Sequence, residues 1–166
     1  MNLPPAPVSG RLDGTLHRFA VRVYYEDTDL SGVVYHANYL RWFERARSDL
    51  LRLVGVDQRA AADAGEGFFA VADVALRFAA PARLEDDVVI ETEALEVGAA
   101  SVRLRQRAVR YAGPGGTLLA EGVLRIGFVS PDGRPRRQPA GWREAFAALL
   151  ADPCIADPAI ADKDRA

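Results

Sequence analysis

The sequence contains few residues of the kinds that build metal sites and disulfide bonds. Its 166 residues include one cysteine, Cys154, and two histidines, His17 and His36. A single cysteine excludes a disulfide bond within the chain. Three such residues are also too few for a structural zinc site, which takes four cysteine and histidine ligands. We therefore expect no metal site.

The sequence also lacks an excess of positive charge. It has 21 basic and 23 acidic residues, a formal net charge of −2 and a pI near 5.7. Nucleic-acid-binding proteins usually carry a basic excess. Every apolar run is too short or too interrupted to span a bilayer, and residues 1–14 lack the basic and apolar segments of a signal peptide. We expect a soluble cytoplasmic protein that binds no nucleic acid and does not insert into a membrane.

Several catalytic motifs are missing as well. We find no glycine-rich phosphate loop of the nucleotide-binding kinds, no helix with paired histidines and no Gly-x-Ser-x-Gly nucleophile elbow. What remains is an acid-rich segment early in the chain.

The apolar pattern predicts an α+β fold. Residues 18–25 alternate as a strand, residues 38–54 follow helical spacing with Gly55 as the stop signal, and 142–150 indicate a short terminal helix. Between the helices, four strands are expected at 68–80, 88–97, 101–111 and 118–129, the last two joined by the turn at 113–116. We expect a flexible lead-in at 1–14, one domain at 15–150 and a flexible tail at 151–166. Exposed edge strands of this length favour a dimer or tetramer.

The acid-rich segment follows the first predicted strand directly. Asp27 and Asp29 precede a turn at Ser31-Gly32, and His36 precedes a helix that begins near Asn38. This order can bring a carboxylate to the amide-rich start of a helix, an arrangement suited to attacking a carbonyl and holding the resulting oxyanion.

Each of these residues also has a structural interpretation. Asp29 could be a turn or capping residue, His36 a packed side chain and Asn38 a helix N-cap or a partner for the loop backbone. Glu44 could lie on a solvated or salt-bridged helix face.

One long segment resembles a known family. Residues 24–47, YYEDTDLSGVVYHANYLRWFERAR, resemble the hot-dog-fold acyl-CoA thioesterases of the 4-hydroxybenzoyl-CoA thioesterase superfamily, and look closest to the bacterial Tol–Pal-associated branch. The resemblance continues through residues 76–92 and 133–139, so it covers roughly residues 18–145.

The resemblance implies a curved antiparallel sheet of about five strands wrapped around one long helix, with active sites between two subunits. It implies that Asp29 is the catalytic carboxylate and that the backbone N–H of His36 polarises the thioester carbonyl. Arg136 and Arg137 are candidates to bind the phosphates of coenzyme A. The coenzyme A thioester is the substrate, and no cofactor is expected. Supporting residues would be Tyr25, Asp27, Gly32, Val34, Tyr35, Asn38 and Glu44.

The assembly implied is a homodimer that pairs into a homotetramer, and an acyl carrier protein could replace coenzyme A as the thiol carrier. Two positions depart from the family pattern. The turn at 98–100 carries no charge to grip a nucleotide, and Leu30-Ser31 replaces the usual Ala/Pro-Gly, a change expected only to adjust the loop.

Two mechanisms remain open at this point. Asp29 could attack the carbonyl and form a mixed anhydride, or it could act as general base on a water molecule. Two other functions also remain open. One is a non-catalytic hot-dog module that binds acyl groups or an envelope complex, and the other is a hydratase or dehydratase that pairs His36 with Glu44.

Overall fold

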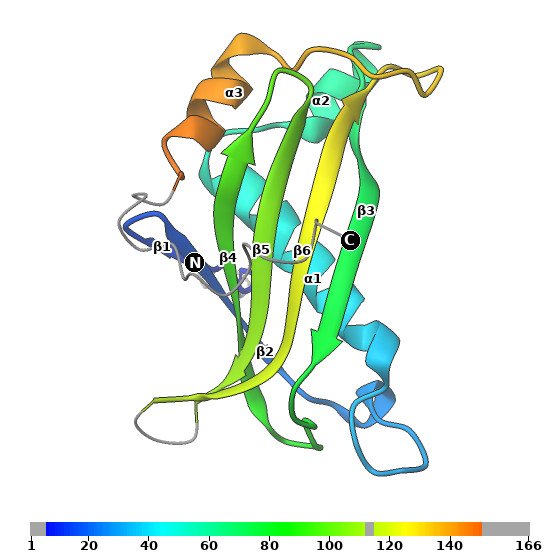
Figure 1. Cartoon of the computed structure of the whole chain (residues 1–166), viewed down its shortest axis with the longest axis vertical. Helices are drawn as coiled ribbons and strands as arrows, with labels where there is room; N and C mark the ends of the chain where they lie inside the picture. The colour runs from blue at the N-terminus through cyan, green and yellow to red at the C-terminus, as the bar shows by residue number, and fades with distance from the viewer. Residues whose placement is uncertain (1–5, 112–114, 151–166) are drawn as a thin grey trace, which may run out of the picture.

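A curved antiparallel sheet wraps around one long helix (Figure 1). The computed structural model describes residues 6–111 and 115–150. Six strands pair in the order β1–β2–β4–β5–β6–β3, all antiparallel. The α+β architecture predicted from the sequence is confirmed, with one strand more than expected. The strands are β1 Arg11–Asp13, β2 Leu16–Arg22, β3 Phe68–Phe78, β4 Asp87–Val97, β5 Ser101–Arg110 and β6 Thr117–Val129.

The helices are α1 His36–Leu53, α2 Gln58–Asp63 and α3 Ala140–Ala147, and a 3-10 turn, η1, covers Tyr25–Asp27. The sequence pattern predicted α1 and α3 but not α2, which is only six residues long and is capped by the Asp57 carboxylate on the Ala60 N–H. No helix in the described ranges is both long and apolar enough to cross a membrane. The predicted tail at 151–166 lies outside the described residues.

Helix α1 packs its apolar face into the concave side of the sheet, as its spacing predicts. Tyr39, Phe43 and Ala46 are buried, whereas Leu53, expected on the same face, is 42% exposed. Each large side chain buried in this way stabilises the fold by about 1.5–3 kcal/mol. The helix packs closely at Gly122 of β6, where an added Cβ would lie 3.1 Å from the Phe43 ring. A side chain at this position would push the helix away from the sheet.

A bulge in β3 changes which of its side chains face the core. The pairing with β6 shifts between Val71 and Asp73, so the predicted single face running from Phe68 to Phe78 is wrong. Before the bulge, Phe69 packs inward, 5.4 Å from the Phe128 ring, and Phe68 is 41% exposed. Beyond it, Phe78 lies 5.6 Å from the ring of Tyr39. A bulge inserts one residue and moves the following side chains to the other face.

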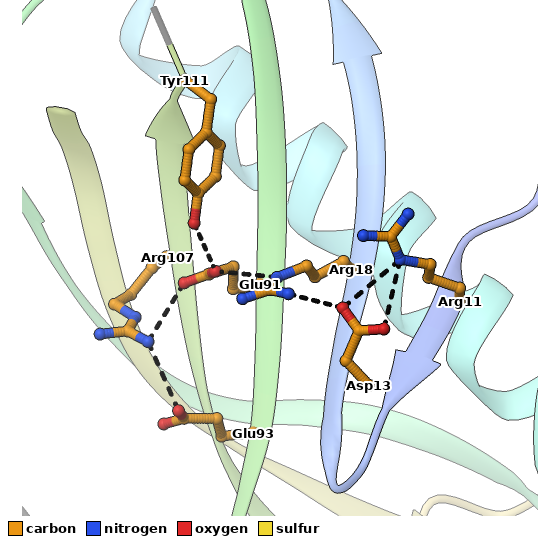
Figure 2. A network of polar contacts seen from close by, with 7 residues as sticks. All are labelled: Arg11, Asp13, Arg18, Glu91, Glu93, Arg107 and Tyr111. Atoms are coloured by element: carbon orange, nitrogen blue, oxygen red, sulfur yellow. Dashed lines mark hydrogen bonds and ion pairs between the residues drawn. The ribbon is translucent and has the colours of Figure 1, made fainter. Parts of the chain in front are cut away.

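The sequence predicted a flexible lead-in at residues 1–14, but residues 11–13 of this range form strand β1. A turn at Gly14 returns the chain into β2, and three residues are too few to show an alternating pattern in the sequence. Figure 2 shows the polar network that holds this edge. Glu91 accepts hydrogen bonds from Arg18 and Tyr111 and pairs with Arg107, and Arg18 also reaches Asp13. The network therefore connects β1, β2, β4 and β5.

A buried contact between His17 and Asp49 attaches the N-terminal segment to α1. His17 is fully buried, and its Nε2 lies 2.9 Å from Oδ2 of Asp49, whose side chain is 1% exposed. Asp49 also accepts hydrogen bonds from the Ser9 hydroxyl and the Gly10 N–H, both at 2.8 Å. An added Cβ on Gly10 would lie 2.6 Å from His17 Nε2, so only glycine fits there.

Candidate active site

A short hairpin loop carries the predicted catalytic residues to the start of α1. Thr28 and Val34 form an isolated bridge, the Asp29 N–H donates to the Val33 carbonyl at 3.1 Å, and the Gly32 N–H donates to the Asp29 carbonyl at 2.9 Å. Gly32 has φ of +73°, a backbone conformation that costs free energy for residues with a Cβ. The conformation of the turn Asp29–Gly32 is therefore fixed by its backbone hydrogen bonds and by this glycine.

Asp27 and Asn38 hold the base of this loop. The Asp27 carboxylate, which is mostly buried, accepts from the Tyr24 N–H at 2.8 Å and so ends β2. The Asp27 carbonyl accepts from the Asn38 side-chain amide at 2.8 Å and from the Tyr35 N–H at 2.9 Å. Asn38 thus satisfies the loop backbone, which was one of its two predicted roles. The helix N-cap is Tyr35 instead.

Asp29 is exposed at the tip of the loop and is held by one neighbour. Its Oδ1 accepts two hydrogen bonds from Ser31, one from the backbone N–H at 2.8 Å and one from the hydroxyl. The Ser31 hydroxyl, then its N–H and, more weakly, the charge of His36 lower the pKa of Asp29 below its ordinary value, against a small opposing effect of desolvation. Asp29 is therefore a carboxylate at neutral pH.

Helix α1 begins at His36, next to this carboxylate. In the described part of the chain, neither the His36 nor the Ala37 N–H donates a hydrogen bond. The start of a helix also carries a partial positive charge, so these donors favour an oxygen that gains negative charge. The His36 ring is exposed; its centroid lies 4.3 Å from that of the Tyr35 ring, in a tilted arrangement, and 6.4 Å from that of the Phe78 ring, in an edge-on arrangement.

An open cavity of about 310 Å³ adjoins His36, and its lining is mostly apolar. The Val34 N–H donates to the Ala82 carbonyl at 2.9 Å, which brings the segment after β3 against the catalytic loop. The resemblance covers this segment, but sequence reasoning did not place it at the site, because a long-range contact brings it there. The cavity is lined by Val33, Val34, His36, Tyr39, Phe78, Ala79, Ala80 and Pro81.

Two predicted supporting residues have side chains that form no hydrogen bond with Asp29 or His36 in the described part of the chain. Tyr25 is 84% exposed on η1, and none of the hydrogen bonds found among the described residues uses its hydroxyl. Glu44 accepts from the Ser48 hydroxyl at 2.6 Å on the exposed face of α1. It lies eight residues beyond His36, which is about 12 Å along the helix. His36 and Glu44 are therefore not brought together within one chain.

The predicted phosphate-binding arginines lie at the other end of the sheet from Asp29. The loop before α1 is at the lower end of β3 in Figure 1, and the segment after β6 is at its upper end. Strand β3 has 11 residues, so these ends are about 35 Å apart. Arg136 also donates to the carbonyls of Gly65 and Glu66 at 3.3 and 2.6 Å, which occupies part of its guanidinium.

The arrangement holds the kinds of groups that acyl chemistry uses. An ionised carboxylate, the N–H groups at the start of a helix and an apolar cavity lie around the same loop. Such groups can polarise a carbonyl through the N–H donors and supply a nucleophile or base to act on it. Among residues 6–111 and 115–150, no group of three or more His, Cys, Asp or Glu side chains is arranged to hold a metal ion.

Comparisons with known proteins identify the family. Residues 23–150 match the family model described as the thioesterase-like superfamily. The acyl-CoA thioester hydrolase YbgC of Escherichia coli O6:H1 is 41% identical over 120 residues, which cover 72% of this chain and 87% of that protein. A probable thioesterase from Bartonella henselae is 34% identical with a TM-score of 0.68, covering 75% of this chain and 99% of that one.

The fold is also that of a mutant 4-hydroxybenzoyl-CoA thioesterase solved with 4-hydroxybenzoyl-CoA. That structure has a TM-score of 0.72 at 23% identity and covers 80% of this chain and 99% of that one. The resemblance stated from the sequence, and the hot-dog fold that it implies, are confirmed. This chain belongs to the thioesterase-like superfamily.

Proposed function

We propose that this protein hydrolyses acyl-CoA thioesters to a free acid and coenzyme A. The observation that carries the proposal is that one loop bears the ionised Asp29 and leads into the unpaired N–H groups that begin α1, where an apolar cavity adjoins His36. The name of the E. coli relative, an acyl-CoA thioester hydrolase, supports the same activity. The acyl group would lie in the cavity, with its carbonyl toward the His36 N–H.

Asp29 would act by one of two routes. As a nucleophile, it forms a bond from a carboxylate oxygen to the carbonyl carbon while the C–S bond breaks and coenzyme A leaves as a thiolate. Water then cleaves the mixed anhydride and restores Asp29. As a general base, it takes a proton from a water molecule that attacks the same carbon. A thiol ionises near pH 8.5, so neither route needs a strong acid beside the leaving group.

The alternative functions lack comparable support. A hydratase would need His36 and Glu44 to act on one substrate, and they lie about 12 Å apart along α1. A binding module without activity would need no ionised acid at the start of the helix. Free-thiol release from short, medium, long and aromatic acyl-CoAs tests the proposal. Turnover supports hydrolysis, whereas tight binding without thiol release would indicate a binding module.

We also propose that a second copy of the chain pairs along β3. This strand is one edge of the sheet, is 11 residues long and exposes four apolar side chains, whereas β1 at the other edge has three residues. An edge of this length normally needs a cover. The exposed side chains are Phe68, Val71, Val74 and Phe78, each 41–52% exposed.

A twofold dimer of this kind would complete each active site. A strand paired with its own twofold copy runs antiparallel to it, so the start of β3 in one protomer meets the end of β3 in its partner. Arg137 would then lie near the Asp29 loop of the partner subunit and could bind coenzyme A phosphates there. Arg136 would contribute less, because its guanidinium donates to Gly65 and Glu66.

Mixed dimers test this composite site. Arg137→Ala alone should raise KM for acyl-CoA several-fold and leave kcat unchanged. A dimer of one Asp29→Asn protomer and one Arg137→Ala protomer should regain one site with the wild-type KM, because one of its two sites has both native residues. Only high-KM turnover in the mixed dimer would mean that Arg137 serves its own protomer. Arg59→Ala, at an exposed arginine of α2, is the control for lost surface charge.

Four further expectations from the sequence concern the assembly, the location, a link to an envelope complex and the thiol carrier, and we keep them as proposals. We expect two dimers to form a homotetramer, a cytoplasmic location and, through the Tol–Pal-associated branch, a link to an envelope complex. An acyl carrier protein remains the alternative thiol carrier. Thiol release from matched acyl-CoA and acyl-carrier-protein substrates separates the two carriers by their kcat/KM values.

A further inference from the structure

We propose that Ser31 is a positioning residue that holds one carboxylate oxygen of Asp29 and leaves the other oxygen to react with the substrate. The inference rests on the proposed function, since it assigns Ser31 a role in the same reaction. Sequence analysis expected the Leu30-Ser31 pair only to adjust the loop.

Two donors of Ser31 converge on the same oxygen. The Ser31 N–H and the Ser31 hydroxyl both donate to Oδ1 of Asp29. In the described ranges, no hydrogen bond is found to Oδ2. An aspartate held at one oxygen by two donors cannot rotate its carboxylate freely, so Oδ2 keeps a fixed direction.

The turn that carries Ser31 is itself restrained. The Gly32 N–H donates to the Asp29 carbonyl, and the Asp29 N–H donates to Val33 across the loop. These bonds involve the backbone alone, and they remain when the Ser31 side chain changes. The serine hydroxyl is therefore one hydrogen bond added to a turn that is already formed, and its removal affects Asp29 more than the fold.

This arrangement has two consequences for the reaction. Fixing Oδ2 reduces the rotation that must be lost before it attacks the carbonyl carbon or takes a proton from water. The donors on Oδ1 also favour the charged carboxylate, in line with the lowered pKa of Asp29. In the nucleophilic route the new bond would form at Oδ2, while the C–S bond breaks and the thiolate leaves.

Ser31→Ala tests the inference, because it removes the hydroxyl and keeps the N–H donor. We expect kcat to fall between about threefold and a hundredfold with KM unchanged. The acid limb of the kcat–pH profile should move to higher pH, since Asp29 loses the donor that lowers its pKa most. Ser31→Thr, which keeps a hydroxyl, should restore both values. Ser9→Ala, which removes a serine–aspartate hydrogen bond away from the site, is the matched control and should change neither.

Three results would overturn the inference. They are a wild-type kcat with an unmoved acid limb in Ser31→Ala, a rise in KM alone, and a complete loss of turnover, which would make Ser31 the nucleophile itself. Failure of the proposed function is recognised separately, because the wild-type protein would then release no thiol from any acyl-CoA, whereas turnover retained in Asp29→Asn would mean that Asp29 is not the catalytic carboxylate. If Asp29 proves essential and Ser31→Ala behaves as wild type, only the role of Ser31 is wrong.

Discussion

Asp29 combines exposure with a pKa below the ordinary carboxyl value of 3.8, because Ser31 donates two hydrogen bonds to it. The catalytic form of this residue is the charged one in both proposed routes. A lowered pKa keeps the Asp29 carboxylate charged down to a lower pH. At the residue scale, we therefore expect Asp29 to be charged, as both proposed routes require, across the whole neutral range.

The pH dependence of turnover follows from this direction. We expect kcat/KM to be independent of Asp29 titration from about pH 5 to pH 8, and to fall as the pH drops below the ordinary carboxyl pKa of 3.8. Initial rates of thiol release at fixed ionic strength measure the profile. An acid limb near pH 6 would mean that a different group, with a raised pKa, is the essential base.

At the scale of elements, the contact between β2, the N-terminal segment and α1 depends on Asp49. Burial favours its neutral form, but hydrogen bonds from His17, Ser9 and Gly10 outweigh burial and lower its pKa below 3.8. A group with a lowered folded-state pKa stabilises the fold above its unfolded pKa, and this stabilisation is lost as the pH falls through the folded pKa.

Asp49→Asn should therefore lower the free energy of unfolding at pH 7 by about 2–4 kcal/mol, because it leaves buried donors without their charged acceptor. It should also make the free energy of unfolding fall less steeply as the pH drops below 4. Urea unfolding at several pH values measures both effects. Asp63→Asn, at an exposed ion pair with Arg59, is the control and should change the free energy by less than about 1 kcal/mol. Equal effects of the two substitutions would contradict the account.

The helices and strands also show how much of the fold the sequence predicts. Helix α1 and strands β4 to β6 follow clear periodic patterns, and the sequence predicted their bounds closely, although the strand pairing shifts between Ala94 and Glu96 and between Ala108 and Val109. Strand β1 is too short to show a period, and the bulge between Val71 and Asp73 reverses the faces of β3 without a sequence signal.

The same distinction applies to the candidate site. Asp29, the turn and His36 are neighbours along the chain, so local reasoning brought them together. The cavity needs the segment around Phe78, which reaches the loop through the contact of Val34 with Ala82, and no local pattern encodes that contact. The bonds from Ser31 to Asp29 needed atomic positions, because a serine in a turn has many possible partners.

At the scale of the whole molecule, the proposed pairing of β3 with a second copy of the chain is the feature to test. Val74→Lys places a charge on this edge and should halve the molecular mass measured by light scattering, since a buried charge at a strand pair opposes pairing. Turnover should fall with the loss of the dimer. Leu12→Lys, at the other edge of the sheet, is the matched control and should keep the wild-type mass. A wild-type mass for Val74→Lys would place the interface elsewhere.

The most direct test of the central claim compares thiol release from an acyl-CoA by the wild-type protein, Asp29→Asn and Asp27→Asn. We predict that Asp29→Asn folds normally and loses turnover by about a thousandfold or more, as expected for a nucleophile or base. Asp27→Asn should keep most of the turnover, because its carboxylate holds the Tyr24 N–H at the base of the loop. Wild-type turnover in a folded Asp29→Asn protein would contradict the account.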